Sequence, residues 1–388
     1  MLKNILISGL LCTLLSAQSF DEFLQKAIDN SPYLKASTLN LEQAQEEGSA
    51  LTRYANPSLA LEYSNFSPDI GERDNGYRVN LSQPLRLWGV GSAKDRLSHL
   101  INENAKVNYI SKKALFIRDI SLAFSLYSQK KMLRSLGNEE LKIAKTIYEI
   151  SKARYEVGTI SRGVMLQSQV AFELIGISNN TLSLQSEQSY YSLLKFAGIN
   201  EEISLDTSSS FKLLSTKSTN PKILKFEAAG KQALAEADVN SNAVEWVKVF
   251  AEYESEPEQD IARIGLNIPL AVFNTKSQEK TIAKLEATKS ELLVLNETTQ
   301  QDIEKTRLSS QRQRLELLKS QNQKILITEE ELLIMFKEGY KIANINLLEL
   351  QDIKNKMIET KEAIIQIQNA LNQNIIYTNY LQGSYNDY

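Results

Sequence analysis

Apolar and polar residues alternate along four short stretches of the chain. In the first stretch Leu59, Leu61 and Tyr63 fall on one side, and small or polar residues fall on the other. Because successive side chains of a strand point to opposite faces, this period of two predicts strands with one apolar and one polar face. The predicted strands lie near residues 57–66, 76–84, 244–254 and 261–269. Phe250 is an apolar residue on the polar side of the third stretch.

Long tracts without proline follow the second and fourth stretches, at residues 85–220 and 270–388. In the first tract Gly137 and Asn138 interrupt the helical pattern, and we expect a kink there. Residues 270–338 also lack glycine, so nothing in this segment forces a helix to bend.

Leucine and isoleucine recur in this second tract at steps of seven, three, seven and seven, which is the spacing of a coiled-coil contact. These residues are Leu308, Leu315, Leu318, Ile325 and Leu332. We therefore expect a helix that approaches roughly 100 Å in length.

The two halves of the chain carry the same succession of features. Pro84 and Pro269 each end an alternating stretch. They lie 185 residues apart, and we call this interval the repeat offset. Gly158 and Gly339, where we expect the long helices to break, are separated by nearly the same interval. This agreement indicates a duplicated unit of helix, strand, strand and long helix. The expected repeats are 18–203, with a helical hairpin turning near 158, and 204–388, with one turning near 339–345.

The beginning of the chain is typical of an export signal. A basic residue, an apolar run at residues 5–15 and two small residues follow one another. A run of this length is too short to span a bilayer, so we expect residues 1–17 to be a signal peptide that is removed. The only cysteine, Cys12, lies within it. Lipid attachment at Cys12 is the less favoured alternative, because Leu11 before it is large.

Composition and motifs exclude several classes of function. The formal charge of −3 gives no sign of a nucleic-acid partner. Without Cys12 the chain has neither disulfides nor thiolate metal ligands, and its methionines are scattered. The sole histidine, His99, lies in a charged helical segment, and no nucleotide-loop, zinc-protease or nucleophile motif is present. We therefore expect no enzymatic activity, no cofactor and no metal site.

The apolar faces of the four predicted strands need a partner. A soluble hairpin packed on a helix is the commoner arrangement, but the flanking helices are too long and too polar to cover these strands. The connections SPDIGERDN and ESEPEQD are polar, as loops in water are. If the apolar faces meet lipid, four strands cannot close a barrel, and hydrocarbon does not tolerate open edges. Three copies of the chain would supply twelve strands.

The two tryptophans are consistent with a membrane location. Trp88 follows the second strand and Trp246 opens the third, so an up-and-down strand order places both at the same end of the sheet. An aromatic belt at a membrane interface has this arrangement, and two tryptophans that cover a core are the alternative. No segment after the signal reaches 18 apolar residues in a row, so a membrane-spanning helix is not expected.

Taken together, the export signal, the duplicated unit and four motifs resemble the TolC-type outer-membrane efflux proteins. The motifs are SQPLRLWG, IPLAVFN, RYEVGTIS and LLELQD, and IPLAVFN is most similar to the branch that serves heavy-metal and related pumps. The resemblance spans nearly the whole chain after the signal. It implies an α+β membrane protein, a homotrimer whose twelve strands form an outer-membrane barrel that twelve helices continue into the periplasm. It also implies a periplasmic adaptor and an inner-membrane pump as partners.

By this resemblance the turns of the two helical hairpins form a periplasmic tip. Val157, Gly158 and Thr159 match a motif that contacts the adaptor in this family, and Gly339 lies at the second turn. Glycines that merely end their helices are the alternative interpretation.

The resemblance also implies a constriction of the tunnel. Glu349 and Asp352 match two acidic positions at the tunnel mouth, and a spacing of three places them on one helical face. Six carboxylates from three chains would favour cations, whereas a solvated helix face is the alternative. The segment after Gly339 is about four residues longer than the usual pattern, and the first repeat has Val164 and Gln167 at the matching positions.

Between strand and helix, the segment LSQPLRLWGVGSAKDRL admits two interpretations. A dinucleotide-binding loop would need a buried parallel strand before it and a third glycine, where this chain has Lys94. We favour a junction between a membrane barrel and a periplasmic helix, with Ser92 as the helix N-cap. Its expected residues are Gln83 and Pro84, which end strand pairing, Trp88 at the interface, Gly89 at the bend, and Pro269 and Phe273 in the second repeat.

The function expected from the sequence is that of an outer-membrane channel subunit, a passive exit duct with a periplasmic helical extension. An inner-membrane pump would deliver its substrates through the adaptor. One alternative is the outer-membrane channel of a type I protein secretion system. A periplasmic coiled-coil structural or adaptor protein is less favoured, because it would not need four amphipathic strands. The sequence does not encode the cargo.

Overall fold

The computed structural model describes residues 17–67, 73–208, 210–215 and 218–388. The export signal expected at residues 1–17, with Cys12, lies outside the described residues except for Ala17. Among the helices described, none is long and apolar enough to cross a membrane.

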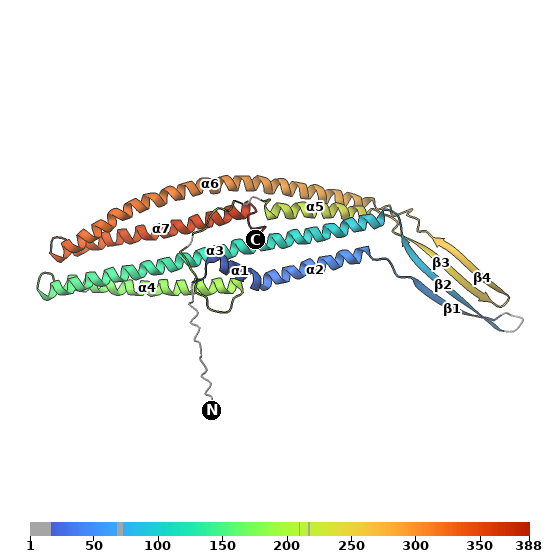
Figure 1. The fold of residues 1–388 in the computed structure, drawn as a ribbon, viewed down its shortest axis with the longest axis horizontal. Coiled ribbons are helices and arrows are strands. Elements are labelled where there is room, and N and C mark those ends of the chain that lie inside the picture. The colour runs from blue at the N-terminus through green and yellow to red at the C-terminus, as the bar shows by residue number, and fades with distance from the viewer. Residues whose placement is uncertain (1–16, 68–72, 209, 216–217) are drawn as a thin grey trace, which may run out of the picture. The chain divides into compact units, whose positions relative to one another are not determined.

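The described chain forms seven helices and four strands in the order expected of a duplicated unit (Figure 1). The first half contains α1 (Phe20–Asn30), α2 (Pro32–Thr52), β1 (Ser58–Phe66), β2 (Asp74–Arg86), α3 (Val90–Glu156) and α4 (Arg162–Ala197). The second half contains α5 (Pro221–Asn240), β3 (Trp246–Glu256), β4 (Gln259–Asn267), α6 (Ser277–Lys341) and α7 (Leu347–Leu381). These elements belong to two units, and the long helices α3 and α6 contribute to both.

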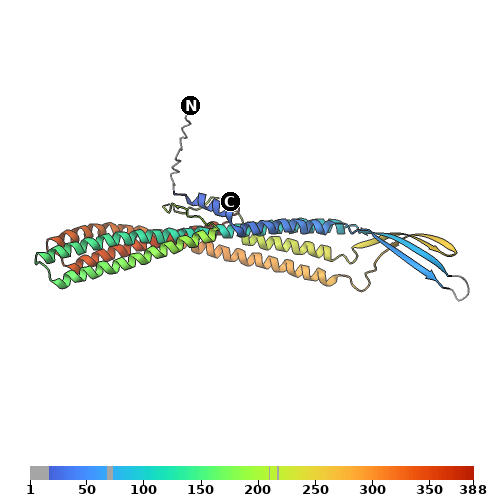
Figure 2. The ribbon, with the colours of Figure 1, turned by 90° about the horizontal axis from the view of Figure 1, so that it is seen from below.

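The sheet unit comprises Ala36–Lys112 and Thr219–Gln301. Its four strands are antiparallel in the order β1-β2-β3-β4, so each neighbour in sequence is a neighbour in space. In two views the strands run out beyond the ends of the helices of this unit (Figures 1 and 2). β1 and β4 are therefore edge strands, each with a partner on one side only among the described residues.

One face of the sheet is apolar and exposed. Leu61, Ile264 and Leu266 are 70%, 87% and 64% exposed, although burial of such side chains is what normally stabilises a strand. Phe250, which the alternation placed on the polar face, covers Gly265 directly opposite it on β4. A Cβ atom at Gly265 would lie 2.5 Å from the Phe250 ring, so the phenylalanine occupies the space that glycine leaves.

The helical unit comprises residues up to Lys35, Lys113–Ser218 and Asp302–Tyr388. Within it the hairpins α3/α4 and α6/α7 lie side by side (Figures 1 and 2). Its largest core is aromatic and aliphatic, with Phe23 of α1, Ile117 and Phe124 of α3 and Leu193 of α4 fully buried. This burial fixes the short helix α1 on the long hairpin α3/α4.

Gly137 and Asn138 do not interrupt α3, which is one continuous helix from Val90 to Glu156. A Cβ atom at Gly137 would lie 2.7 Å from the side chain of Asn179 on α4. The glycine therefore permits close helix packing, and Asn179 donates a hydrogen bond of 2.9 Å to the side chain of Asn138.

Candidate functional sites

At the first strand-to-helix junction, β2 continues past Pro84 and pairs with β3 as far as Arg86 opposite Trp246. The expectation that Gln83 and Pro84 end the pairing is therefore wrong. β1 pairs only with the part of β2 before these residues, so Pro84 has a neighbouring strand on one side, where a missing N–H is tolerated. Gln83 instead donates a hydrogen bond of 3.0 Å to the carbonyl of Ala55, in the segment that leads into β1.

Arg86 organises this junction, and its role was missed in the sequence. Its buried guanidinium donates to the main-chain carbonyls of Leu51, Thr52 and Arg53, at 3.4, 3.2 and 2.7 Å. These carbonyls lie at the C-terminal end of α2, where the last carbonyl groups of a helix have no N–H partner within the helix. A cation at this end also interacts favourably with the helix dipole.

Two aromatic rings and an acidic side chain complete the environment of Arg86. The guanidinium carbon lies 5.4 Å from the ring centre of Tyr54 and 4.8 Å from that of Trp246. Glu245 lies 3.8 Å from Arg86 Nε and also pairs with Lys94 of α3. Trp246 therefore packs at the junction rather than standing free. The only signal in the sequence was a single charge between two leucines.

Trp88 and Gly89 occupy the bend itself. Trp88 is fully exposed, and Gly89 adopts a φ of 87°, in the left-handed region that favours glycine. α3 then begins at Val90, so the expectation that Ser92 is the N-cap is wrong. Ser92 lies inside the first turn and donates a hydrogen bond of 3.0 Å to the carbonyl of Gly89.

The second junction lacks these ties. The residue one repeat offset after Arg86 is Ala271, which has no side chain to cap a helix. Phe273, one repeat offset after Trp88, is 100% exposed, and Leu270 beside Pro269 is also exposed. Pro269 follows the end of β4 at Asn267, so it does not take part in the strand.

The first hairpin turn connects α3 to α4. Gly158 has a φ of 78°, and its N–H donates to the carbonyl of Tyr155 at 2.9 Å. The N–H of Thr159 donates to Arg154 at 2.9 Å, and the Ser161 side chain caps α4. A left-handed residue thus ends α3, as expected for Gly158. Val157 is 75% exposed at this turn.

The second hairpin turn has the same main-chain hydrogen bonds, between residues one repeat offset later in the chain. Its left-handed residue, however, is not Gly339. α6 continues through Gly339 to Lys341, so the expectation that it breaks at Gly339 is wrong. The left-handed residue is Ala343, with a φ of 68°, and Asn346 caps α7 as Ser161 caps α4. Gly339 makes room for Ile345, whose side chain would lie 2.8 Å from a Cβ atom there.

The two turns are connected by Tyr340, which is fully buried. Its hydroxyl lies 2.8 Å from the hydroxyl of Ser151 on α3, and its carbonyl accepts a hydrogen bond of 2.7 Å from Arg154. The Arg154 guanidinium also lies 4.6 Å from the centre of the Tyr340 ring. Gly339 is the residue one repeat offset after Arg154, so the second turn carries no equivalent arginine.

Glu349 and Asp352 lie in the first turns of α7 and are exposed. The Glu349 carboxylate accepts a hydrogen bond of 3.1 Å from the N–H of Asn346, which makes a reciprocal capping box. Asp352 accepts a hydrogen bond of 2.7 Å from Lys356, and this bond raises the pKa of Lys356. The acidic pair is therefore partly engaged within its own helix. The repeat offset places Val164 and Gln167 at the matching positions.

The polar face of the sheet carries a chain of ion pairs that reaches all four strands. Arg78 on β2 pairs with Glu62 on β1 at 2.9 Å and with Glu254 on β3 at 2.5 Å. Arg263 on β4 pairs with Glu252 at 2.7 Å and with Glu254 at 2.5 Å. The alternation in the sequence predicted a polar face but not this connected network.

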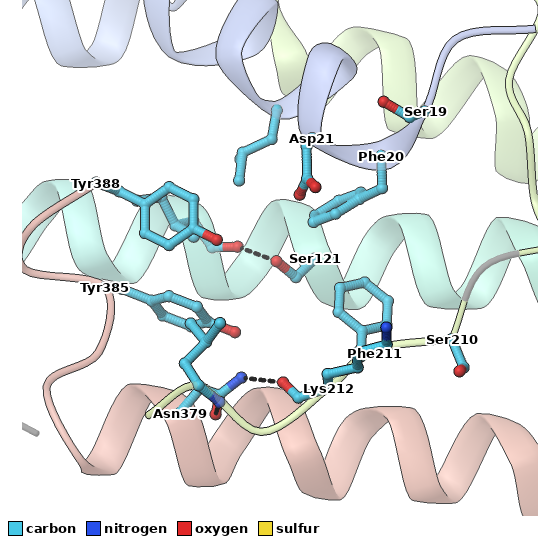
Figure 3. A pocket seen from close by; sticks show the side chains of 13 residues that line it. Ser19, Phe20, Asp21, Ser121, Ser210, Phe211, Lys212, Asn379, Tyr385 and Tyr388 are labelled. Atoms are coloured by element: carbon cyan, nitrogen blue, oxygen red, sulfur yellow. Dashed lines mark hydrogen bonds between the residues drawn. The ribbon is translucent and has the colours of Figure 1, made fainter. Parts of the chain in front are cut away.

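A cavity of about 310 Å³ lies in the helical unit between α1, the segment around Phe211 and the residues after α7 (Figure 3). Asn379 donates a hydrogen bond of 2.9 Å to the carbonyl of Lys212 at its wall. Burial raises the pKa of Tyr385, another wall residue, to about 12, so its hydroxyl stays protonated. None of the site residues expected from the sequence lines this cavity. Among the described residues, no group of three or more acidic, histidine or cysteine side chains is placed to hold a metal ion.

Comparisons with known proteins agree with this architecture. Residues 23–198 match the sequence model of a family described as outer membrane efflux protein. No curated protein sequence matches the chain significantly.

Solved structures show the same fold over almost the whole chain. The CmeC outer membrane channel of Campylobacter jejuni is 16% identical, with a TM-score of 0.74 over 94% of this chain and 85% of that one. The outer membrane protein VceC of Vibrio cholerae is 13% identical, with a TM-score of 0.77 over 94% and 95%. The open state of the MtrE outer membrane channel of Neisseria gonorrhoeae is 15% identical, with a TM-score of 0.76 over 93% and 88%.

At these identities the structures establish the fold, and the family match covers residues 23–198, most of the first repeat. The resemblance expected from the sequence motifs is thereby confirmed. The first repeat of the chain therefore matches the outer membrane efflux protein family, and nearly the whole chain shares the fold of outer-membrane channels, which supports a location in the outer membrane with a helical extension in the periplasm.

Proposed function

We propose that three copies of this chain form an outer-membrane channel that serves as the passive exit duct of a tripartite efflux system. The observation that carries the proposal is the sheet, whose apolar face is exposed and whose two edge strands have no partner on their outer side among the described residues. Lipid suits the exposed face, but hydrocarbon does not tolerate open strand edges. If β4 of one copy pairs with β1 of the next, no strand edge stays open and the apolar face can contact lipid. Three copies then give a closed barrel of twelve strands.

The exposed aromatic residues support the same placement. Trp88 and Phe273 hold equivalent positions in the two repeats, and both are fully exposed. Each follows a strand at the end of the sheet where the helices begin. In the proposed barrel they would form a belt at the periplasmic interface of the membrane, where aromatic side chains are enriched.

The hairpin turns would face away from the membrane and contact the adaptor. At the first turn Val157 is 75% exposed, and Gly158 and Thr159 complete its surface. At the second turn Ile342, which follows the last residue of α6, is 68% exposed, while Gly339 lies inside that helix. Apolar side chains exposed on tight, well-defined turns suit a helical adaptor that packs against them.

Glu349 and Asp352 would line the tunnel where it narrows. Three copies would bring six carboxylates together, with the three Lys356 side chains offsetting part of their charge. The remaining negative charge would favour cations over anions in the constriction. The channel itself supplies no energy, so transport would depend on the inner-membrane pump.

A channel for type I protein secretion has the same architecture in this proposal and differs only in its pump. A periplasmic structural or adaptor protein is disfavoured, because the exposed apolar strand face would have no cover. The heavy-metal branch is favoured only by the IPLAVFN motif.

Fractionation followed by single-channel recording tests the proposal. We expect the mature protein in the detergent-extracted outer-membrane fraction, and large, voltage-independent openings when it is inserted into planar bilayers. Replacing both Glu349 and Asp352 with alanine should raise conductance or relieve block by divalent cations. Release of the protein by osmotic shock without detergent contradicts the membrane assignment. Unchanged conductance and block in the double variant contradict the constriction.

A further inference from the structure

The chain of ion pairs on the polar face of the sheet is unfinished at both ends. It begins at Glu62 on edge strand β1 and ends at Arg263 on edge strand β4. One edge of the sheet therefore presents an acid and the other a base. The two side chains are also accessible, since Glu62 is 59% and Arg263 is 43% exposed.

Both terminal residues have atoms left for a further partner. Arg78, in the interior of the sheet, uses Nη1 for Glu62 and both Nε and Nη2 for Glu254. In the described part of the chain, every ion pair of Arg263 runs through Nη1 alone. Glu62 likewise receives its hydrogen bond on Oε2 only. Arg263 already holds Glu252 and Glu254 through Nη1, so its Nε and Nη2 can accommodate a third carboxylate.

Strand pairing within one chain indicates the register in which β4 would pair with β1 of another copy, because the two halves of the chain are equivalent. Arg78 and Arg263 are equivalent at the repeat offset. Glu62 and Glu252 are equivalent as the strand partners of these two arginines, although they lie slightly further apart in sequence because the first hairpin loop is longer. Arg78 also stands opposite Glu254 on its other side, and its Nε lies 3.9 Å from Glu252, one step along the same face.

Applying this register to β4 and to β1 of a second copy gives a specific pairing. Arg263 would stand opposite Ser64, with Glu62 one step along the same face. Ile264 would stand opposite Tyr63, and Leu266 opposite Leu61, so the apolar faces of the two copies coincide. A shift by a single residue would turn one apolar face inward, which the alternation forbids.

We propose that Arg263 pairs with Glu62 of the adjacent copy, which closes the ion-pair chain into a continuous belt inside the barrel and fixes the register between subunits. The inference rests on the proposed trimeric barrel and names the contact that joins its copies. Opposite charges on facing edge strands favour this pairing and disfavour alternatives that leave a charge without a partner.

Disulfide trapping between copies tests the register directly. The only cysteine of the sequence is Cys12, in the expected signal, so introduced cysteines should react without competition. We expect Tyr63→Cys with Ile264→Cys to cross-link copies in outer membranes at least fivefold more than Leu61→Cys with Ile264→Cys. Adding Arg263→Gln or Glu62→Gln should lower the yield of the matched pair at least threefold.

Arg78→Gln is the matched control. It removes the equivalent arginine, but the partners of Arg78 all lie within its own chain, so the yield should stay unchanged. Cross-linked oligomers whose yield does not respond to Arg263→Gln overturn this pairing and leave the channel intact. A preference for the Leu61→Cys pair overturns the register. The absence of any cross-linked oligomer in the membrane fraction overturns the proposed trimer, and this inference with it.

Discussion

The two repeats of the chain share their backbone geometry but differ in the side chains that tie strand to helix. At the first junction Arg86 caps the end of α2 and stacks against two aromatic rings. At the second junction Ala271 holds the equivalent position, and Phe273 projects without cover. The hairpin turns, by contrast, repeat the same main-chain hydrogen bonds at the repeat offset.

This difference shows which features a duplication must keep. A turn depends on local hydrogen bonds and one left-handed residue, so both copies retain it even though Gly158 corresponds to Ala343. A junction depends on what surrounds it, and in a trimer the surroundings of the two junctions need not be alike. The first junction is therefore tied within the chain, whereas the second keeps its apolar side chains exposed, where lipid or a neighbouring copy would cover them in the proposed trimer.

The largest expected effect comes from removing the tie of the first junction. Arg86→Ala would leave the end of α2 without its cap and Glu245 without one of its partners, a loss of about 3–5 kcal/mol for a broken buried charge network. We expect a large drop in the temperature at which the detergent-extracted protein loses its helical circular dichroism. Ala271→Arg, at the equivalent position, should change that temperature little. Equal effects of the two substitutions would refute the difference between the junctions.

The left-handed residues of the turns should respond in opposite directions. Gly158→Ala places a Cβ in a left-handed conformation and should cost about 1 kcal/mol, since no other atom crowds the site. Ala343→Gly removes that strain from the second turn and should be neutral or stabilising by up to about 1 kcal/mol. Thermal unfolding of the two variants measures both. Destabilisation by the same amount in both would mean that the turns are not equivalent.

The smallest expected effect on stability separates the charge of Glu349 from its role as a cap. Glu349→Gln retains a side chain that can complete the capping box, so the thermal midpoint should move by less than the equivalent of about 0.5 kcal/mol. Block of the channel by divalent cations should still weaken, because one ring of charge is lost. Asn346→Ala is the complementary control, since it removes the N-cap, should cost about 1 kcal/mol and leaves the charge in place. A large loss of stability in Glu349→Gln would show that the carboxylate serves the fold alone.

Features with a short sequence period could be predicted, because they depend on neighbouring residues. The alternation of Leu59, Leu61 and Tyr63 indicated a strand, and β1 spans Ser58–Phe66. The absence of proline indicated long helices, and α3 and α6 span 67 and 65 residues. The exposure of the apolar strand face then follows from the lack of any element to cover it among the described residues.

Features that depend on tertiary contacts could not be predicted from the sequence. Gly339 looked like a helix end because it is a glycine, yet it provides space for Ile345, and the left-handed residue is Ala343. Pro84 looked like the end of a strand, yet it lies where β2 has a single neighbour. The position of Arg86 between two leucines did not reveal its role, since its three carbonyl partners lie far from it in sequence, on the other side of the first hairpin.

The number of chains in the detergent-extracted complex tests the central claim most directly. Native mass spectrometry of the mature protein purified from outer membranes should give the mass of three chains, because twelve strands are needed to close the sheet in the proposed way. A complex of three chains that resists dissociation in mild detergent agrees with the account. A stable monomer, or an assembly that is not a multiple of three, contradicts it.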